Sequence, residues 1–202
     1  LGLFARHHAI QIPIHLDLDT GMHRLGFEPK HLTELKKLIS AYPELKIASL
    51  YTHLVGADEE VHHDFSIQQL DQFMEMKSQV EAVLAYKPLI HALNSAGIVR
   101  YPDYQMDMVR LGIGLYGVEV TGKYDASLKP VSTLKTTISQ VKELPAGATV
   151  GYSRKGVLAQ GGKIATLAIG YADGYDRRFS QGIGYVIIQG KKAPVIGNVC
   201  MD

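Results

Sequence analysis

The chain has 202 residues, of which 46% are hydrophobic and 20% are charged, and its formal net charge is +1. This length can bury one substantial core, or one part-domain with a smaller second domain. So small a net charge gives no electrostatic reason to expect a nucleic acid or a membrane surface as partner. Because there is neither a long apolar run nor a secretory pattern at the start, we expect a cytoplasmic protein.

The first part of the chain alternates between strand and helix patterns. Runs of aliphatic and β-branched residues predict strands at 12–19, 47–54, 89–95 and 106–117. Apolar residues that recur every three or four positions predict helices at 29–41 and 60–86, and a short helix is expected after residue 95. Four such units predict parallel crossovers and half of an eight-fold β/α barrel, although an open doubly wound sheet gives the same pattern.

The pattern changes after Gly117. Residues 118–128 are polar and rich in turn formers, which indicates a boundary. Beyond it, runs of Val, Ile and Thr are separated by glycine and proline turns, which is typical of a small β domain. We therefore predict the second half of a barrel at 1–118, a linker at 119–128 and a partial β domain at 129–202. The single cysteine, Cys200, is expected to be a small apolar core residue in a reducing compartment.

Candidate functional residues follow the predicted strands, because working residues of parallel α/β folds gather at the carboxyl ends of strands. The rule selects Asp17 with Asp19 and the loop after them, His53, Asn94 with Ser95, and Arg110. Ser95 opens a helix, so its hydroxyl either holds a phosphate or is a plain N-cap. His53 by itself is more often a hydrogen-bonded core histidine. Arg110 lies in an apolar strand, where a buried guanidinium needs a partner or a ligand.

Seven segments resemble, in order and with similar spacing, the successive signatures of alanine racemases. They are HLDLDTGMHRLGF, LYTHLVGADEE, HALNSAGI, MVRLGIGLYG, VGYSRKG, IGYADGYDRR and VIGNVCMD. The resemblance covers essentially the whole chain and implies a TIM-type barrel followed by a β domain. It also implies an isomerase that interconverts L-alanine and D-alanine with pyridoxal phosphate and two bases, a tyrosine and a lysine, and that supplies D-alanine for peptidoglycan.

The resemblance implies a role for each matching residue. Tyr152 is the catalytic tyrosine and is hydrogen-bonded by His53, while Arg110 faces the pyridine nitrogen of the cofactor. The cofactor-binding residues implied are His53, Ser95, Arg110, Gly112 and Ile113, with Ser95 on the phosphate. The substrate-binding residues implied are Arg24, Tyr152 and Met201, and the entrance residues are Tyr171 and Asp58. A homodimer with shared active sites is implied, and no metal is expected.

Three departures from the family pattern are visible. Asp17 stands where many members carry a lysine, often carbamylated, so we expect its carboxylate to support Arg24 directly. The loop after Tyr152 reads SRKG, which leaves the loop geometry open. The family's Schiff-base lysine lies in a VKADAYGHG-like strand that these residues do not contain. Both ends of the chain look like cuts, so we expect a central fragment that is inactive alone.

Other readings stay open at this level. One alternative is a related amino-acid racemase of broad specificity. A decarboxylase with the same domain plan is disfavoured by the IGYADG and CMD segments. Another alternative, from a different functional class, is a non-catalytic pyridoxal-binding fragment.

Overall fold

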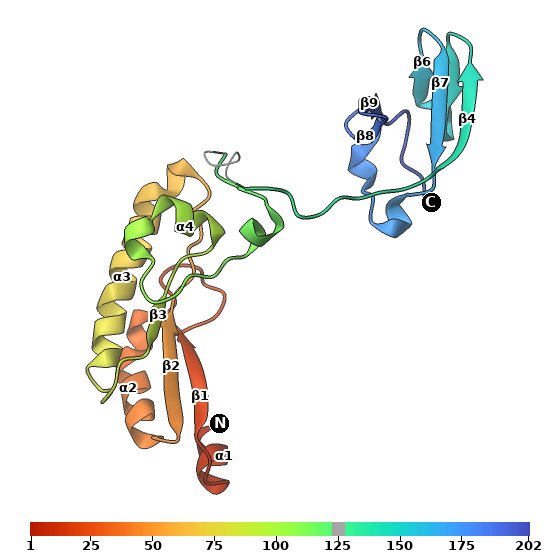
Figure 1. Ribbon diagram of the computed structural model, residues 1–202. Helices are drawn as coiled ribbons and strands as arrows, with labels where there is room; N and C mark the ends of the chain where they lie inside the picture. The colour runs from red at the N-terminus through yellow and green to blue at the C-terminus, as the bar shows by residue number, and fades with distance from the viewer. Residues whose placement is uncertain (123–127) are drawn as a thin grey trace. The chain divides into compact units, whose positions relative to one another are not determined.

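The computed structural model describes residues 1–122 and 128–202, and the chain divides into two compact units, Leu1–Ser132 and Thr133–Asp202 (Figure 1). The predicted linker at 119–128 includes residues 123–127, which lie outside the described residues. Each unit has its own sheets and its own hydrogen bonds, and each is described by itself.

The first unit is built on a parallel sheet with strand order β1-β2-β3. The strands are β1 (Ile12–Asp17), β2 (Leu45–Tyr51) and β3 (Leu89–His91). The helices are α1 (Gly2–His7), α2 (Leu32–Ala41), α3 (His63–Glu81) and α4 (Ser95–Arg100). Four 3₁₀-helices of the described residues complete the unit, namely η1 (Pro29–His31), η2 (Glu60–His62), η3 (Pro102–Tyr104) and η4 (Ile113–Tyr116).

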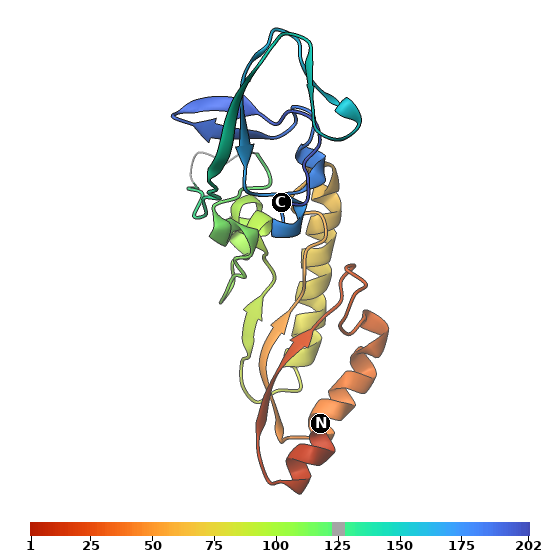
Figure 2. The same ribbon diagram turned by 90° about the vertical axis from the view of Figure 1, so that its right-hand side faces the viewer.

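The core of this unit lies between the sheet and helices α2 and α3, which cover the same face of the sheet (Figures 1 and 2). Leu16 and Leu50 point from the strands into this layer, where Leu35, Leu70 and Phe73 meet them from the helices. Most of the apolar stripe that predicts each helix is therefore buried, although Leu38, Met74 and Val83 of the predicted stripes stay exposed. Burial of such side chains is worth about 1.5–3 kcal/mol each, and it fixes the helices on the sheet.

The alternation of strands with parallel crossovers is confirmed, but the predicted strand at 106–117 is wrong. Only two backbone hydrogen bonds join this segment to the β3 region, from the Asp107 amide to the Ile90 carbonyl (3.1 Å) and from the Arg110 amide to the Leu93 carbonyl (3.0 Å). The Asp107 carboxylate accepts from the Ile90 amide at 2.8 Å. The Asp107 side chain thus accepts from the Ile90 amide, which in a regular sheet would donate to a backbone carbonyl of the next strand. Residues 113–116 then form η4.

The second unit contains antiparallel pairs of strands, as the β-domain pattern predicts. Within the described residues the pairs are β4 (Ile138–Leu144) with β7 (Gly162–Leu167), β5 (Ala148–Val150) with β6 (Gly156–Leu158), and β8 (Tyr185–Ile188) with β9 (Lys191–Pro194). Short 3₁₀-helices lie between them at η6 (Tyr152–Arg154), η7 (Tyr171–Asp173) and η8 (Arg177–Phe179).

The tightest turn of this unit joins β8 to β9 through Gln189 and Gly190, whose φ angles are 50° and 77°. Two successive positive φ angles define the two-residue hairpin turn that matches the twist of the strands. Cys200 is a free thiol, but it is only half-buried, so its predicted place in the core is wrong. Its neighbour Val199 takes the buried position instead.

Candidate active site

Three polar side chains stand at the carboxyl ends of the three parallel strands. Asp17 is the last residue of β1, Tyr51 the last of β2 and His91 the last of β3. The strand register pairs Asp17 with Tyr51 and Tyr51 with His91. The three residues therefore form one row across the sheet, on the face opposite Leu16 and Leu50.

Arg110 extends over this row and donates to three backbone carbonyl groups, of which that of His91 also accepts from the Thr52 amide. Its Nη2 donates to the carbonyl oxygens of Thr52 (2.7 Å) and Ala92 (3.1 Å), and its Nη1 donates to that of His91 (3.4 Å). Burial lowers the pKa of Arg110 from its usual value, while the neighbouring Tyr51 and Asp17 raise it. Carbonyl oxygens compensate the guanidinium for lost water, so the prediction that Arg110 needs partners is confirmed.

Two imidazoles also contact the Arg110 guanidinium. Nη1 hydrogen-bonds His91 Nδ1, and Nη2 lies 3.3 Å from His53 Nδ1. Burial, followed by the charge of Arg110, lowers the pKa of His91 to about 4 and lowers that of His53 as well. Both rings are therefore neutral at pH 7. Since a guanidinium has only donors, each Nδ1 that faces it must be an acceptor.

Tyr51 connects the arginine to Asp17. The Arg110 guanidinium lies 5.2 Å from the centre of the Tyr51 ring, and Tyr51 is the register partner of Asp17. Burial and the neighbouring Asp19 raise the pKa of Asp17, whereas Arg110 and Arg24 act to lower it. The two cations thus offset the burial of the carboxylate only in part, since its pKa stays above the usual value.

Arg24 is carried by the loop that follows β1. The loop closes through two hydrogen bonds, from the Asp19 amide to the Phe27 carbonyl (3.0 Å) and from the Phe27 amide to the Asp17 carbonyl (2.9 Å). Gly26 has a φ of 106°, and a Cβ there would lie 2.9 Å from the Asp17 carbonyl oxygen. A glycine is therefore required at this turn. The charge of Arg24 acts on the ionisation of Asp17, Tyr51 and His53, which places it within electrostatic reach of the site.

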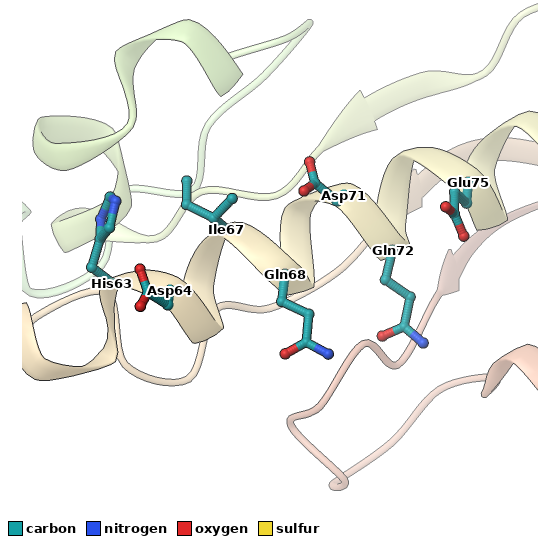
Figure 3. Close-up of a pocket in the computed structure, with 7 residues that line it drawn as sticks. All are labelled: His63, Asp64, Ile67, Gln68, Asp71, Gln72 and Glu75. Atoms are coloured by element: carbon teal, nitrogen blue, oxygen red, sulfur yellow. The ribbon is translucent and has the colours of Figure 1, made fainter.

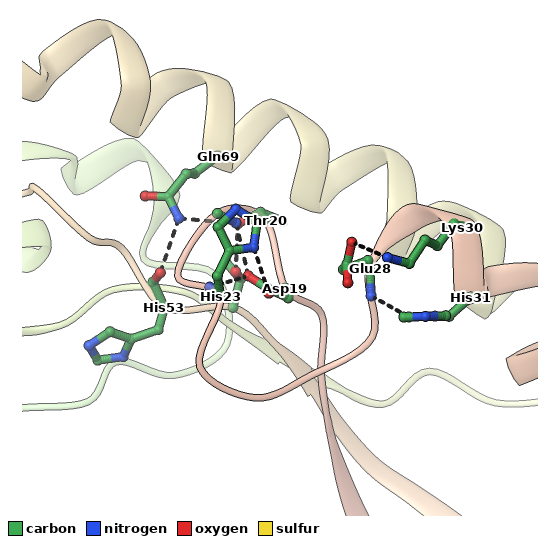
Figure 4. Close-up of polar contacts among 10 residues, drawn as sticks. Asp19, Thr20, His23, Glu28, Lys30, His31, His53 and Gln69 are labelled. Atoms are coloured by element: carbon green, nitrogen blue, oxygen red, sulfur yellow. Dashed lines mark hydrogen bonds and ion pairs between the residues drawn. The ribbon is translucent and has the colours of Figure 1, made fainter.

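A buried glutamine fixes the backbone beside His53. Gln69 reaches from α3, and its Nε2 donates to the His53 carbonyl (3.1 Å) and to Thr20 Oγ1 (3.4 Å), as Figure 4 shows. Its Oε1 accepts from the Val55 amide (3.0 Å). Thr20 is in turn 2.7 Å from Thr52 Oγ1. The loops after β1 and β2 are thus tied to the helix layer, which holds the backbone that carries the His53 imidazole.

Asp19 fixes the loop after β1 through hydrogen bonds from backbone amides to its carboxylate. Its carboxylate accepts from the amides of Gly21 (2.9 Å) and His23 (3.0 Å), and it lies 3.2 Å from His23 Nδ1 (Figure 4). These bonds lower the pKa of Asp19 although burial acts to raise it. Asp19 therefore has a clear structural role as an anchor of the loop that carries Arg24.

Ser95 meets the glycine-rich segment. Its Oγ accepts from the Gly112 amide (2.9 Å) and the Gly114 amide (3.1 Å). The N-cap of α4 is Asn94, whose Oδ1 accepts from the Gly97 amide (3.0 Å). The reading of Ser95 as a plain N-cap is therefore wrong, because Asn94 has that function. One hydroxyl and the amides of the segment that contains Ile113 converge here. Because the Gly112 and Gly114 amides donate to Ser95 Oγ, an anion at this place would take these donors over from the serine.

The remaining predicted residues are exposed. Tyr152 in the second unit is 75% exposed and lies between Gly151 and Ser153, whose φ angles are 74° and 57°. The amides of Tyr171 and Ala172 donate to the carbonyls of Cys200 and Met201, both at 2.9 Å, so Tyr171 and Met201 lie side by side. The Arg177 guanidinium lies 5.4 Å from the Tyr171 ring centre. In the first unit, Asp58 is exposed next to the buried Ala57.

A surface hollow lies elsewhere in the first unit. It has a volume of about 620 Å³ and is lined along one face of α3 by His63, Asp64, Ile67, Gln68, Asp71, Gln72 and Glu75 (Figure 3). A single helix supplies every lining residue, so the hollow is an outer groove and not the site at the strand ends. In the part of the chain that the structure describes, no cluster of three potential metal ligands is found. No described helix has the length and apolar character to span a membrane.

Sequence reasoning missed His91, Tyr51, Ser49 and His15, all of which lie on the site face of the sheet. A signal was present, because polar residues occupy alternate positions of strands that are otherwise apolar. Strands buried on both faces are normally apolar throughout, so such alternation indicates a polar interior face. Which residues of different strands meet depends on the register, which alternation does not give.

The fold and the site together define a class, which is the β/α-barrel protein with an appended β domain and a cationic site at the carboxyl ends of its strands. The family model described as alanine racemase, N-terminal domain matches residues 3–120, and the model described as alanine racemase, C-terminal domain matches residues 131–202. The chain belongs to the alanine racemase family. The predicted family and the predicted combination of barrel and β domain are thereby confirmed.

Individual relatives agree. The chain is 37% identical over 202 residues to the alanine racemase of Halothermothrix orenii, covering 99% of the chain and 52% of that protein. It is 40% identical over 197 residues to that of Clostridium kluyveri, covering 95% and 50%. The solved alanine racemase of Bartonella henselae, described with covalently bound pyridoxal phosphate, has a TM-score of 0.84 at 30% identity and matches 100% of the chain over 54% of its own. The chain spans about half the length of the relatives it matches.

Proposed function

We propose that these residues form part of a cytoplasmic alanine racemase, a pyridoxal-phosphate-dependent isomerase that interconverts L-alanine and D-alanine and supplies D-alanine for peptidoglycan. The observation that supports it best is the Arg110 guanidinium, held over the strand ends by carbonyl oxygens and two neutral imidazoles. The Bartonella henselae relative is described with covalently bound pyridoxal phosphate, and the donor set here suits that cofactor.

The residues of the first unit fit the two ends of the cofactor. The Ser95 hydroxyl and the amides of Gly112 and Ile113 would hold its phosphate, and Arg110 would face its pyridine nitrogen. A Cβ added at Gly112 would meet only Ser95 Oγ, at 3.5 Å, so the loop leaves room for a group beside the hydroxyl. When bound, pyridoxal phosphate withdraws electrons from the α-carbon of an amino acid and makes its α-proton acidic.

Arg110 limits how far that withdrawal goes. An arginine keeps its proton at any usable pH, so a ring nitrogen that faces it stays unprotonated and the electron withdrawal is weak. Every hydrogen-bonding partner described around this guanidinium is an acceptor, which keeps its own charge in place. Weak withdrawal favours prompt return of the proton to the α-carbon over side reactions.

Tyr152 would remove or return the proton on one face of the α-carbon. A free phenol titrates near pH 10, so it needs polarising neighbours to exchange a proton at neutrality. His53 directs Nδ1 to Arg110, which leaves its Nε2–H to hydrogen-bond the phenol. In this proposal Tyr152 acts in the barrel of a partner subunit, so a homodimer shares two sites. Its exposure in the β domain is consistent with a role across subunits.

Arg24 would bind the carboxylate of alanine. Asp17 would keep the Arg24 side chain oriented. Its carboxylate would replace the carbamylated lysine that many family members carry at this position. The charge of Arg24, which acts to lower the pKa of Asp17, supports this assignment. Met201, next to Tyr171, would contact the substrate, and Tyr171 with Asp58 would line the entrance.

The second base is proposed to be a lysine supplied from outside these residues. Lys30, Lys37 and Lys77 form ion pairs with glutamates at or on helices and not with the site. Pyridoxal phosphate followed by borohydride should therefore leave no stoichiometric adduct at any one lysine of the isolated chain. Mass spectrometry would detect one, and a reduced adduct at a single lysine would overturn this part of the proposal.

A chimaera tests the racemase activity. These 202 residues would replace the matching ones in the Halothermothrix orenii racemase, and the chimaera should racemise alanine, measured by the change in optical rotation. Tyr152→Phe should lower kcat by about 10²- to 10⁴-fold, the usual contribution of a general acid or base. Tyr185→Phe, which changes an exposed strand tyrosine of the same unit, is the matched control and should change little.

The outcomes of this test separate the possibilities. A chimaera that binds pyridoxal phosphate but racemises nothing would support a non-catalytic pyridoxal-binding part instead. Equal rates with several amino acids would indicate a racemase of broad specificity. Full activity of Tyr152→Phe would show that another group transfers the proton.

A further inference from the structure

A line of hydrogen bonds continues from Arg110 away from the proposed cofactor. His91 Nδ1 bonds the guanidinium, and His91 Nε2 lies 3.1 Å from Ser49 Oγ. Ser49 Oγ lies 2.7 Å from His15 Nδ1. Ser49 is completely buried and His91 is 4% exposed, whereas His15 is exposed. The proposed function uses neither Ser49 nor His15.

Hydrogen-bond chemistry gives this line one direction. The guanidinium only donates, so His91 Nδ1 must accept. A neutral imidazole then carries its proton on Nε2, and that N–H donates to Ser49 Oγ. The hydroxyl proton of Ser49 is left to donate to His15 Nδ1. Each group has a partner in this direction, whereas the opposite tautomer of His91 would place two donors against each other in a buried site.

The ring plane of His91 is fixed independently. Tyr51 stacks on it with ring centres 5.0 Å apart and an interplanar angle of 6°. A ring held in this plane keeps Nδ1 on the arginine side and Nε2 on the serine side. Two partners then act on which nitrogen carries the proton: Arg110 requires an acceptor at Nδ1, and the Ser49 hydroxyl gives the Nε2–H an acceptor.

We propose that Ser49, with His15 behind it, is a positioning residue that holds His91 as the Nε2–H tautomer and thereby presents an acceptor to Arg110. The link from this tautomer to catalysis rests on the proposed function of Arg110. The assignment of the tautomer itself does not depend on that function. Removal of the hydroxyl would leave the Nε2–H of His91 buried without a partner. The Nε2–H tautomer would then be less favourable, and the part of the population that moves its proton to Nδ1 would lose or rearrange its contact with Arg110.

The direct test is ¹⁵N NMR of the histidine side chains in the 202-residue chain. His91 should show a protonated Nε2 and a bare Nδ1. Ser49→Ala should create a population with protonated Nδ1, and Ser49→Thr, which keeps the hydroxyl, should restore the original pattern. An unchanged His91 tautomer in folded Ser49→Ala would overturn the proposal.

The matched control is Ser66→Ala. Ser66 is also completely buried, and within the described residues its hydroxyl has no hydrogen-bond partner, so the substitution removes the same atom without touching the line. The His91 signals should not change. If Ser49→Ala does not fold, His15→Ala replaces it, because His15 is exposed; it should shift the tautomer less, and no shift at all would overturn the role of His15.

Kinetic measurements on the chimaera test whether the His91 tautomer affects catalysis. Ser49→Ala should lower kcat about tenfold, the scale of outer partners that orient a functional group, with KM for alanine nearly unchanged and a shifted visible absorbance of the cofactor. Ser66→Ala should change none of these. A tautomer change with unaltered kinetics and absorbance would refute the link to Arg110, while an inactive parent chimaera would count against the proposed function alone.

Discussion

The two units solve the problem of holding functional side chains in different ways. In the first unit, helices cover one face of a parallel sheet, and Arg110 is held by several partners at the strand ends. In the second unit the strands occur in pairs, and Val199 is the one buried hydrophobic residue among those described. Two-stranded pairs are marginal without a further layer. Tyr152 is accordingly mostly exposed.

This difference indicates where each half of the chemistry is determined. The first unit creates its own environment, since burial lowers the pKa of His53 and His91 and raises that of Asp17. In the second unit, the pKa of the exposed Asp176 is lowered to about 2 by its hydrogen bonds with Arg178. The first unit therefore carries a preorganised site, and the second carries a residue whose environment must come from the surface it meets. The following substitutions test this contrast, from the largest expected effect to the smallest.

Arginine substitutions compare the units most directly. Arg110→Leu leaves carbonyl oxygens without their donor and should lower the free energy of unfolding by about 3 kcal/mol. Arg178→Leu removes a side chain that is 88% exposed, and it should leave stability unchanged within the error of urea unfolding. Equal losses from both substitutions would contradict the contrast between the units.

Gln69→Leu tests whether the buried polar ties of the first unit matter. The substitution removes the partners of the His53 carbonyl and the Val55 amide, so it should cost about 2 kcal/mol in urea unfolding. The neighbouring Gln68 is exposed on the same helix, and Gln68→Leu should change stability by less than about 0.5 kcal/mol. A neutral Gln69→Leu would mean that water replaces the lost bonds.

These expectations show which features sequence reasoning could supply. Apolar periodicity was sufficient to predict α2 and α3, because their buried residues are the ones at that spacing. It failed for residues 106–117, where the Asp107 side chain replaces a ladder bond, since an apolar run does not show where its hydrogen bonds go. The sequence motifs were sufficient to select Arg110, Ser95 and His53 as candidate site residues. They did not predict which groups these residues hydrogen-bond.

The partners escaped because they depend on register. The pairing of β1 with β2 shifts between Ile14 and His15, so His15 faces Ser49 and not Ala48. A single-residue shift of this kind changes which side chains share a face, and it allows Ile47 and Leu50 both to be buried. Neither fact is encoded in alternation alone, and without them the line from His15 to Arg110 cannot be drawn.

Acid should weaken the first unit before the second. The pKa of His91 is lowered to about 4, below the value near 6.5 of an unfolded chain, so the unfolded state binds more protons between these values. Stability should therefore fall as pH drops from about 6.5 to 4, by roughly 1 to 2 kcal/mol after allowance for solvent screening. Asp17, with its raised pKa, acts in the opposite sense.

His91→Asn isolates this contribution, because asparagine can still accept from Arg110 but cannot titrate. Hydrogen exchange followed by mass spectrometry would report each unit separately. Loss of protection in the first unit should begin near pH 6 in the parent chain and be reduced in the variant. The second unit should respond only as pH falls below about 4, where Asp176, with its lowered pKa, is protonated in the unfolded chain. Identical profiles for parent and variant would show that His91 does not dominate this window.

The smallest effect concerns the loop that presents Tyr152. Ser153 has a φ of 57°, a conformation that glycine adopts without steric cost, so Ser153→Gly should stabilise the chain by about 0.5 kcal/mol. Thr166→Gly in β7, at an exposed position paired with Gln140, is the control and should destabilise by a similar amount, because glycine loses more freedom in a strand. Opposite signs, measured by urea unfolding, would establish that the loop stores strain beside the tyrosine. If Ser153→Gly also slowed racemisation in the chimaera, that strain would be part of how an exposed phenol is aimed at a site that its own unit does not build.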